Sequence, residues 1–168
     1  MIKRHSEKTE PWELTLERLL PLWGHRNWIV VADSAYPAQS NPGIETVATD
    51  GDHLQVLKKT LGALDKSRHV RANIYLDTEL HAVGEQDAPG VTRFRQDLMR
   101  LIGKRETRVL GHEQIIAKLD ESARMFRIPI LKSKLAIPYT SVFFELDCGY
   151  WTREAEERLR HSLAKRNP

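Results

Sequence analysis

The alternation of apolar and polar positions divides the chain into short strands and amphipathic helices. Apolar runs rich in β-branched and aromatic residues predict strands at 28–32, 44–48, 70–76, 109–110, 128–131 and 142–146. Apolar residues at helical spacing predict five helices. The first starts at Pro11, the second follows Asp52, and the third carries Phe94 and Leu98. The fourth spans about 112–126, and the fifth follows Thr152, which is its N-cap. Strands and helices therefore alternate. This order predicts an α/β fold, a layered mixed sheet with helices on both faces.

Nothing along the chain suggests a second domain. The sequence of 168 residues is 40% hydrophobic and has no internal repeat, low-complexity stretch or linker. A chain of this size buries roughly 70% of its unfolded surface. We expect one domain over residues 11–168, preceded by a polar and flexible N-terminal segment at 1–10.

Composition argues against several classes of partner. The 26 basic and 23 acidic residues are interspersed, whereas a nucleic-acid site needs basic residues clustered on one face. Cys148 is the single cysteine, which excludes an internal disulfide and a cysteine metal cluster and fits a reducing compartment. The polar start and the lack of a long apolar stretch argue against membrane association. We expect a soluble, cytoplasmic protein that binds neither nucleic acid nor membrane.

Two polar residues bracket the most apolar strand, His25 before residues 28–32 and Asp33 directly after them. A strand rises about 3.3 Å per residue, so these two side chains lie at opposite ends of one strand, about 26 Å apart. They cannot form a local acid–base pair within one subunit. If both serve one site, something else must bring the two ends together, such as a second copy of the chain.

The sequence contains few other motifs that indicate a particular chemistry. The chain has no P-loop, dinucleotide-binding glycine motif, nucleophile elbow or zinc-protease motif. Its histidines are too scattered to indicate a metal site, so we predict neither metal nor cofactor. Polar residues at element ends remain, namely His25, Asp33, His112 and Tyr139. Each also has a purely structural interpretation as a boundary or turn residue, and from chemistry alone the prediction is an α/β domain with a histidine-based site.

Three short motifs, in order, resemble a known family. The first is Gly24-His25 with Asp33 and Pro37, the second is His112-Glu113-Gln114 at a helix start, and the third is Pro138-Tyr139 before the strand at 142–146. Together they resemble the D-ribose pyranase / L-fucose mutarotase (RbsD/FucU) family. The likeness spans roughly residues 12–150.

The resemblance implies an RbsD-like fold and an isomerase that interconverts anomers or ring forms of a free monosaccharide, ribose- or fucose-like. It implies that His25 is the catalytic acid and base, and that Asp33, His112, Tyr139 and Ser141 bind the sugar. It also implies a homo-oligomer with sites between subunits, with a decameric ring as one candidate assembly. The chemistry suits histidine, because ring opening needs proton transfer in both directions near neutral pH and neither metal nor cofactor.

The chain departs from the family pattern at two positions. Asn27 stands where the family has an aspartate two residues after the histidine, and an amide cannot stabilise an imidazolium as a carboxylate does. Ser141 stands where the family has asparagine, and its hydroxyl has a shorter reach. These departures leave two alternatives open: a non-catalytic sugar-binding or regulatory protein on the same scaffold, and an unrelated α/β binding protein. Tyr36 and Trp151 are candidate aromatic platforms for a sugar, with core or interface packing as the alternative for each.

Overall fold

The computed structural model describes residues 11–166, so the N-terminal segment expected to be flexible, 1–10, lies outside the described residues. The strands are β1 (Trp28–Ala32), β2 (Ile44–Ala48), β3 (Val70–Asp77), β4 (Thr107–Leu110), β5 (Ile128–Lys132) and β6 (Val142–Cys148). The α-helices are α1 (Trp12–Leu19), α2 (His53–Lys66), α3 (Val91–Ile102), α4 (His112–Ala123) and α5 (Arg153–Arg166), with 3-10 turns η1 (Leu20–Leu22) and η2 (Thr78–His81).

The strands form one mixed sheet in the order β2-β5-β1-β6-β3-β4. In the described part of the chain, β6 runs antiparallel to both of its neighbours, β1 and β3, while the other paired strands are parallel. The carboxyl ends of β1, β3, β4 and β5 therefore meet at one edge of the sheet, together with the start of β6. The predicted α/β class with a mixed sheet is confirmed.

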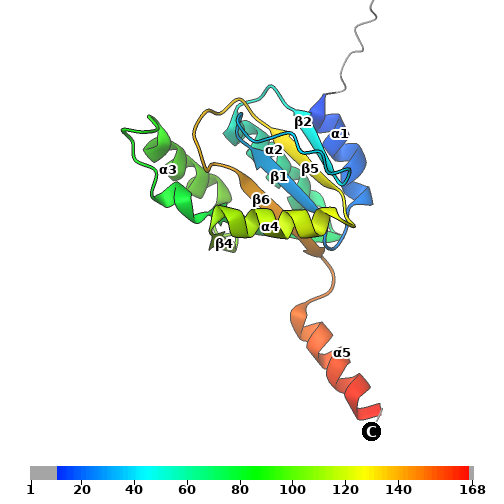
Figure 1. Cartoon of the computed structure of the whole chain (residues 1–168). Coiled ribbons are helices and arrows are strands. Elements are labelled where there is room, and N and C mark those ends of the chain that lie inside the picture. The colour runs from blue at the N-terminus through cyan, green and yellow to red at the C-terminus, as the bar shows by residue number, and fades with distance from the viewer. Residues whose placement is uncertain (1–10, 167–168) are drawn as a thin grey trace, which may run out of the picture.

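Helices cover both faces of this sheet (Figure 1). On one face, α1, α2 and α3 pack against alternate strand residues such as Ile29, Ile74 and Phe144. On the other face, α4 packs through Ile115 and Leu119 against a second cluster of buried residues. All five residues of β1 are buried, because β1 lies in the middle of the sheet with a core on each side.

Pro21 ends the first helix early. The helix stops at Leu19 and is followed by a single 3-10 turn containing Pro21, because proline has no N–H to continue an α-helix. Several other element boundaries differ from those predicted. The helix predicted to reach about residue 126 ends at Ala123. There the chain before β2 crosses so closely that a Cβ on Gly43 would collide with the Ala123 carbonyl. Strand β3 extends one residue further than predicted, to Asp77, and β6 two residues further, to Cys148.

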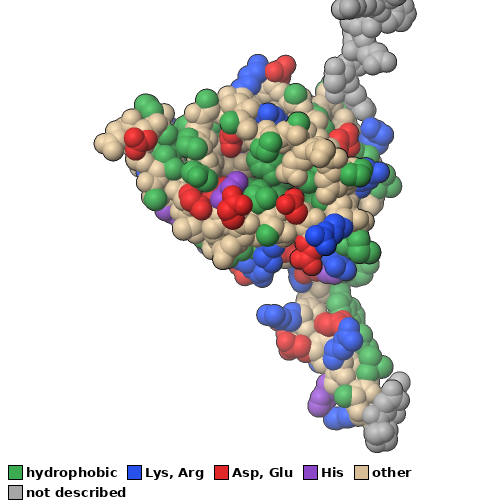
Figure 2. Space-filling view, viewed as in Figure 1, with side chains coloured by type: hydrophobic (Ala, Val, Ile, Leu, Met, Phe, Trp, Pro, Cys, Tyr) green, Lys and Arg blue, Asp and Glu red, His purple; other side chains and the backbone are tan. Residues whose placement is uncertain are grey.

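The last helix, α5, projects away from the sheet and its covering helices (Figure 1). Its exposed apolar residues include Leu159 and Leu163, and green side chains line one side of it in Figure 2. Thr152 caps the helix, as predicted, by accepting a hydrogen bond from the Ala155 N–H. Within residues 11–166, no helix combines the length and apolarity that a membrane crossing requires.

Candidate functional site

Polar side chains gather at the edge where the parallel strands end. Asp33 follows β1, Asp77 is the last residue of β3, His112 starts α4 directly after β4, and Ser133 follows β5. Ser141 precedes β6 at the same edge. Ligands of open α/β sheets bind outside the carboxyl ends of the strands, so this edge is where the fold places a site. Figure 2 shows acidic side chains over α4 on this face, with a histidine beside them.

The best-defined feature of the edge is a carboxylate–imidazole pair. Asp77 is completely buried, and its Oδ2 lies 3.1 Å from Nδ1 of His112, whose side chain is 29% exposed. Burial raises the pKa of Asp77 to about 6, although the adjacent His112 acts in the opposite direction. The carboxylate is acceptor-only when ionised, so in neutral His112 the proton lies on Nδ1, and Nε2 can take up and release a second proton.

Asp33, Ser141 and Tyr139 lie beside this pair. The Ser141 hydroxyl donates to Asp33 Oδ2 across 3.5 Å, and Asp33 Oδ1 accepts the Ala35 N–H, as an Asx turn does. The ring of Tyr139 meets the ring of His112 edge-on, with centroids 5.6 Å apart. Tyr139 has a left-handed backbone (φ 58°) and is 39% exposed. Four of the five predicted site residues are therefore brought together.

A second histidine, His53, is buried at the same edge of the sheet and contacts the residue that follows β5. His53, at the start of α2, is 1% exposed, and its Nδ1 lies 2.8 Å from the Ser133 hydroxyl. Burial lowers the pKa of His53 to about 4, so the ring is neutral at physiological pH. The Ser133 hydroxyl in turn accepts the Leu135 N–H. His53 thus fixes the loop after β5 and does not face solvent.

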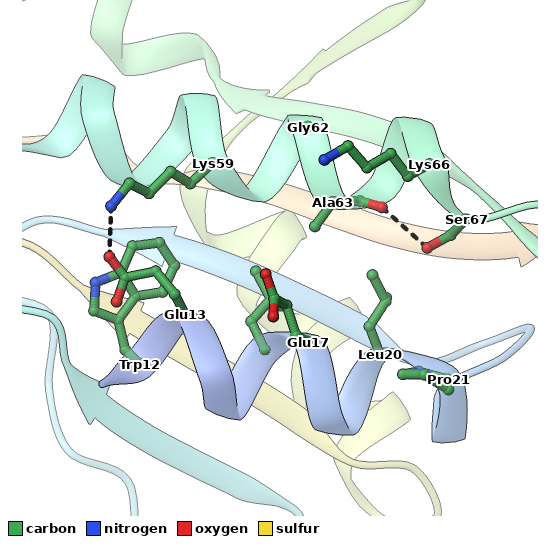
Figure 3. Close-up of a pocket in the computed structure, with 11 residues that line it drawn as sticks. Trp12, Glu13, Glu17, Leu20, Pro21, Lys59, Gly62, Ala63, Lys66 and Ser67 are labelled. Atoms are coloured by element: carbon green, nitrogen blue, oxygen red, sulfur yellow. Dashed lines mark hydrogen bonds and ion pairs between the residues drawn. The ribbon is translucent and has the colours of Figure 1, made fainter. Parts of the chain in front are cut away.

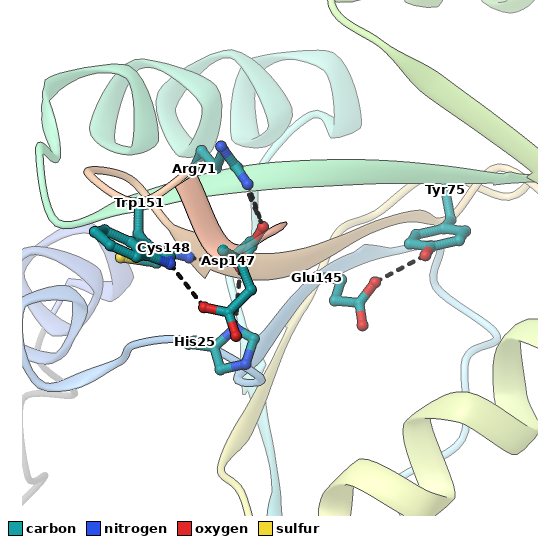
Figure 4. Close-up of polar contacts among 8 residues, drawn as sticks. His25, Arg71, Tyr75, Glu145, Asp147, Cys148 and Trp151 are labelled. Carbon is teal, nitrogen blue, oxygen red and sulfur yellow. Dashed lines mark hydrogen bonds and ion pairs between the residues drawn. The ribbon is translucent and has the colours of Figure 1, made fainter. Parts of the chain in front are cut away.

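His25, the fifth predicted site residue, lies at the opposite edge. It precedes β1, and its side chain is 64% exposed, with Nδ1 3.0 Å from Oδ1 of Asp147. Arg71 also donates to Asp147, and Figure 4 shows these groups converging on the carboxylate. The sequence-based expectation that His25 and Asp33 lie at opposite ends of one strand holds, so a single chain does not bring His25 to the other four residues.

The two aromatic residues considered as sugar platforms lie in different surroundings. Tyr36 is 5% exposed within the core on the α4 face, and burial raises its pKa to about 12. Tyr36 is therefore a core residue, which is the alternative to a sugar platform given from the sequence. Trp151 precedes α5, is 42% exposed, and donates its indole N–H to Glu156.

The larger hollows of the surface lie elsewhere. A cavity of about 560 Å³ runs between α1 and α2, walled by Leu16, Leu20 and Ala63, with the Lys59–Glu13 ion pair at one end (Figure 3). It contains none of the predicted site residues. Among residues 11–166, no group of three or more histidine, cysteine or acidic side chains is arranged to hold a metal ion.

Sequence reasoning missed Asp77, His53 and Asp147. A signal for Asp77 was present, because it follows the apolar run at 74–76 in the same way that Asp33 follows the run at 28–32. His53 starts a predicted helix but gave no sign that it would be buried. Asp147 lies 122 positions from His25, so only the register of β6 could reveal their contact.

Comparison with known proteins identifies the fold of this chain. No protein-family model and no curated protein sequence matches the chain. Among solved structures, RbsD of Bacillus subtilis in complex with D-ribose aligns with a TM-score of 0.53 at 20% identity, covering 87% of this chain and 98% of that one. The fold is that of RbsD. Fucose mutarotase of Streptococcus pneumoniae in complex with L-fucose aligns with a TM-score of 0.54 at 17% identity, covering 83% of this chain and 97% of that one.

The same fold occurs in FucU of Bifidobacterium longum, with a TM-score of 0.50 at 18% identity. The RbsD-like architecture expected from the three motifs is thus confirmed along most of the chain. Two of these similar structures contain a bound monosaccharide, D-ribose or L-fucose.

Proposed function

We propose that this protein is a monosaccharide mutarotase or pyranase that interconverts the anomers or ring forms of a free ribose- or fucose-like sugar. The observation that carries the proposal is the His112–Asp77 pair at the strand edge, with Asp33, Ser141 and Tyr139 beside it. Hydroxyl, carboxylate, phenol and imidazole groups together offer the donors and acceptors that a polyhydroxylated ring requires. The fold shared with sugar-bound RbsD and fucose mutarotase supports the same substrate class.

The reaction needs one base and one acid. A base removes the proton from the anomeric hydroxyl, the bond between the anomeric carbon and the ring oxygen breaks, and an acid protonates that oxygen. The open aldehyde then rotates and recloses through either hydroxyl, which returns both protons. We assign proton removal to neutral His25 and protonation of the ring oxygen to His112 in its imidazolium form, in which Nδ1–H faces Asp77 and Nε2 carries the proton that is transferred. General acid–base catalysis of this kind contributes about 10²–10⁴-fold, which suits a reaction that water alone already allows.

Because His25 and His112 lie at opposite edges of one sheet, the complete site requires two copies of the chain. We propose a homo-oligomer in which the exposed His25 of one subunit faces the edge of Asp33, His112, Tyr139 and Ser141 on its neighbour. Such a contact joins two different surfaces, and heterologous contacts of this type form rings when the rotation between neighbouring subunits closes. The decameric ring suggested by the sequence resemblance is one assembly of this kind.

The test is magnetisation-exchange NMR on a panel of free sugars that includes D-ribose and L-fucose, with and without the protein. We expect faster anomer or ring-form exchange for at least one sugar. His25→Ala should abolish the effect while leaving the thermal midpoint unchanged, because the side chain is 64% exposed and packs against little. His161→Ala, which removes an exposed histidine on α5, is the matched control and should retain full activity.

Two outcomes contradict parts of the proposal. Sugar-dependent shifts without faster exchange would identify the alternative, a sugar-binding or regulatory protein on this scaffold. A fully active His25→Ala variant would remove His25 from the mechanism. Loss of stability in that variant, by about 1–3 kcal/mol, would instead identify a structural histidine.

A further inference from the structure

We infer that Asp147 is the positioning residue of His25: it holds the ring proton on Nδ1, so that Nε2 presents its lone pair to the substrate. The inference rests on the proposed function and extends it to a residue that neither the motifs nor the similar structures assign. The contact that carries it is the 3.0 Å separation of His25 Nδ1 and Asp147 Oδ1.

The register of the sheet explains why Asp147 lies there. The segment before β1 continues the ladder with β6, since the Arg26 N–H donates to the Leu146 carbonyl and the Leu146 N–H to the Asn27 carbonyl. On the other side of β6, Asp147 pairs directly with Arg71 of β3. Asp147 therefore lies between Arg71 and the His25 segment, near the end of a strand that is fixed on both sides.

The carboxylate is firmly held and ionised. Arg71 donates to Oδ2 from Nη2 at 2.6 Å and from Nε at 3.2 Å, and the Cys148 N–H donates to Oδ1 at 2.8 Å (Figure 4). Burial opposes ionisation, but these hydrogen bonds outweigh it and lower the pKa of Asp147. A carboxylate in this state only accepts hydrogen bonds, so the nitrogen that faces it must carry the proton.

Asn27 has a different task. Its Oδ1 accepts the Gly24 N–H at 2.8 Å, and its Nδ2 donates to the Arg127 carbonyl at 3.0 Å. Both ends of the amide therefore bind backbone and fix the loop that carries His25. The position two residues after the histidine does not supply a carboxylate in this chain, and Asp147 supplies one from β6 instead.

His25 and His112 therefore have the same kind of partner. His25 and His112 each have Nδ1 against an aspartate, at 3.0 Å and 3.1 Å, and each therefore offers Nε2 for proton transfer. In the assembly proposed above, one such pair comes from each of two subunits. An acid and a base of the same type on either side of the sugar suit a reaction that must run in both directions.

Nitrogen-15 NMR of the histidine rings tests this inference without relying on activity. At a pH where His25 is neutral, the wild-type protein should show His25 as the Nδ1–H tautomer. In Asp147→Asn, the side-chain amide accepts or donates equally well, so the signal should shift toward the Nε2–H tautomer, which free histidine favours. Asp65→Asn is the matched control, because Asp65 is also held by an arginine, Arg105, but lies away from His25.

Kinetics adds a second readout. For any sugar that the wild type converts, Asp147→Asn should lower kcat by about 10- to 100-fold, a part of the 10²–10⁴-fold that acid–base catalysis provides, with KM unchanged. Asp65→Asn should change neither constant. An Nε2–H tautomer in the wild type, or an unchanged tautomer or kcat in Asp147→Asn, would overturn the inference. If the tautomer shifts as expected but the wild type converts no sugar, Asp147 still positions His25 and the proposed function fails on its own.

Discussion

Asp77 shows how a site residue can lower the stability of the fold. Its carboxyl group is completely buried, and its pKa rises from 3.8 to about 6 because burial disfavours the ionised form. In a group whose folded pKa is raised, the favourable contribution is present below the unfolded pKa and is lost as the pH rises through the folded value. At pH 8, ionised Asp77 therefore destabilises the protein.

We predict that Asp77→Asn increases the free energy of unfolding at pH 8, by at most about 3 kcal/mol, since each pKa unit corresponds to 1.36 kcal/mol. The gain should shrink below pH 6 and vanish below about pH 3, where Asp77 is protonated in both states. The same variant should lose sugar exchange, because an amide no longer fixes His112. Denaturant unfolding at several pH values measures the first effect. A gain that does not depend on pH would contradict this account of Asp77.

Tyr139 offers a separate test of substrate binding. Its ring is 39% exposed and lies edge-on to His112. Tyr139→Phe keeps that ring contact and removes only the hydroxyl, which should weaken sugar binding by about 0.5–1.5 kcal/mol and leave turnover at saturation almost unchanged. Saturation curves from the exchange experiment give both quantities. An unaltered half-saturation concentration would show that Tyr139 belongs to the scaffold only.

At the level of elements, α2 depends on a single N-cap. Asp52 accepts a hydrogen bond from the Gln55 N–H, and the next residue, His53, holds the loop after β5 through Ser133. We predict that Asp52→Ala lowers the free energy of unfolding by about 1 kcal/mol, and that Asp52→Asn, which keeps an oxygen acceptor, retains most of it. Thermal unfolding of both variants checks this. Equal losses in both would mean that charge, and not capping, is what Asp52 contributes.

The elements themselves were largely predictable, because their apolar patterns are local. The strand at 28–32 and the helix that buries Leu57, Leu61 and Leu64 have the expected residues inside. What the pattern does not encode is where a polar residue is buried by distant parts of the chain. The predicted strand stopped at residue 76, yet β3 includes Asp77, which is 0% exposed.

The candidate site was predictable to the same extent. Asp33, His112, Tyr139 and Ser141 are linked to element ends by the sequence, and the parallel strands bring those ends together. The partner of His25 was not predictable. Its contact with Asp147 depends on a strand that arrives 122 residues later and on a register that only the assembled sheet determines.

At the scale of the whole molecule, the central claim is that one sugar site is built from two copies of the chain. The two histidine–aspartate pairs lie at opposite edges of one sheet, and β1 separates them. Light scattering should therefore give an oligomer at micromolar concentration. Leu22 and Met125, which share a surface hollow with Asn27, are 76% and 79% exposed and are candidates to be covered by such a contact.

Subunit complementation tests this claim most directly. His25→Ala and His112→Gln should each be inactive in sugar exchange when purified alone. If each site takes His25 from one subunit and His112 from its neighbour, randomly mixed oligomers of the two variants contain intact sites at about one position in four. We predict that co-expression or co-refolding restores about a quarter of the wild-type rate. Mixed oligomers that stay inactive, although both variants are shown to be in one assembly, would contradict a site shared between subunits.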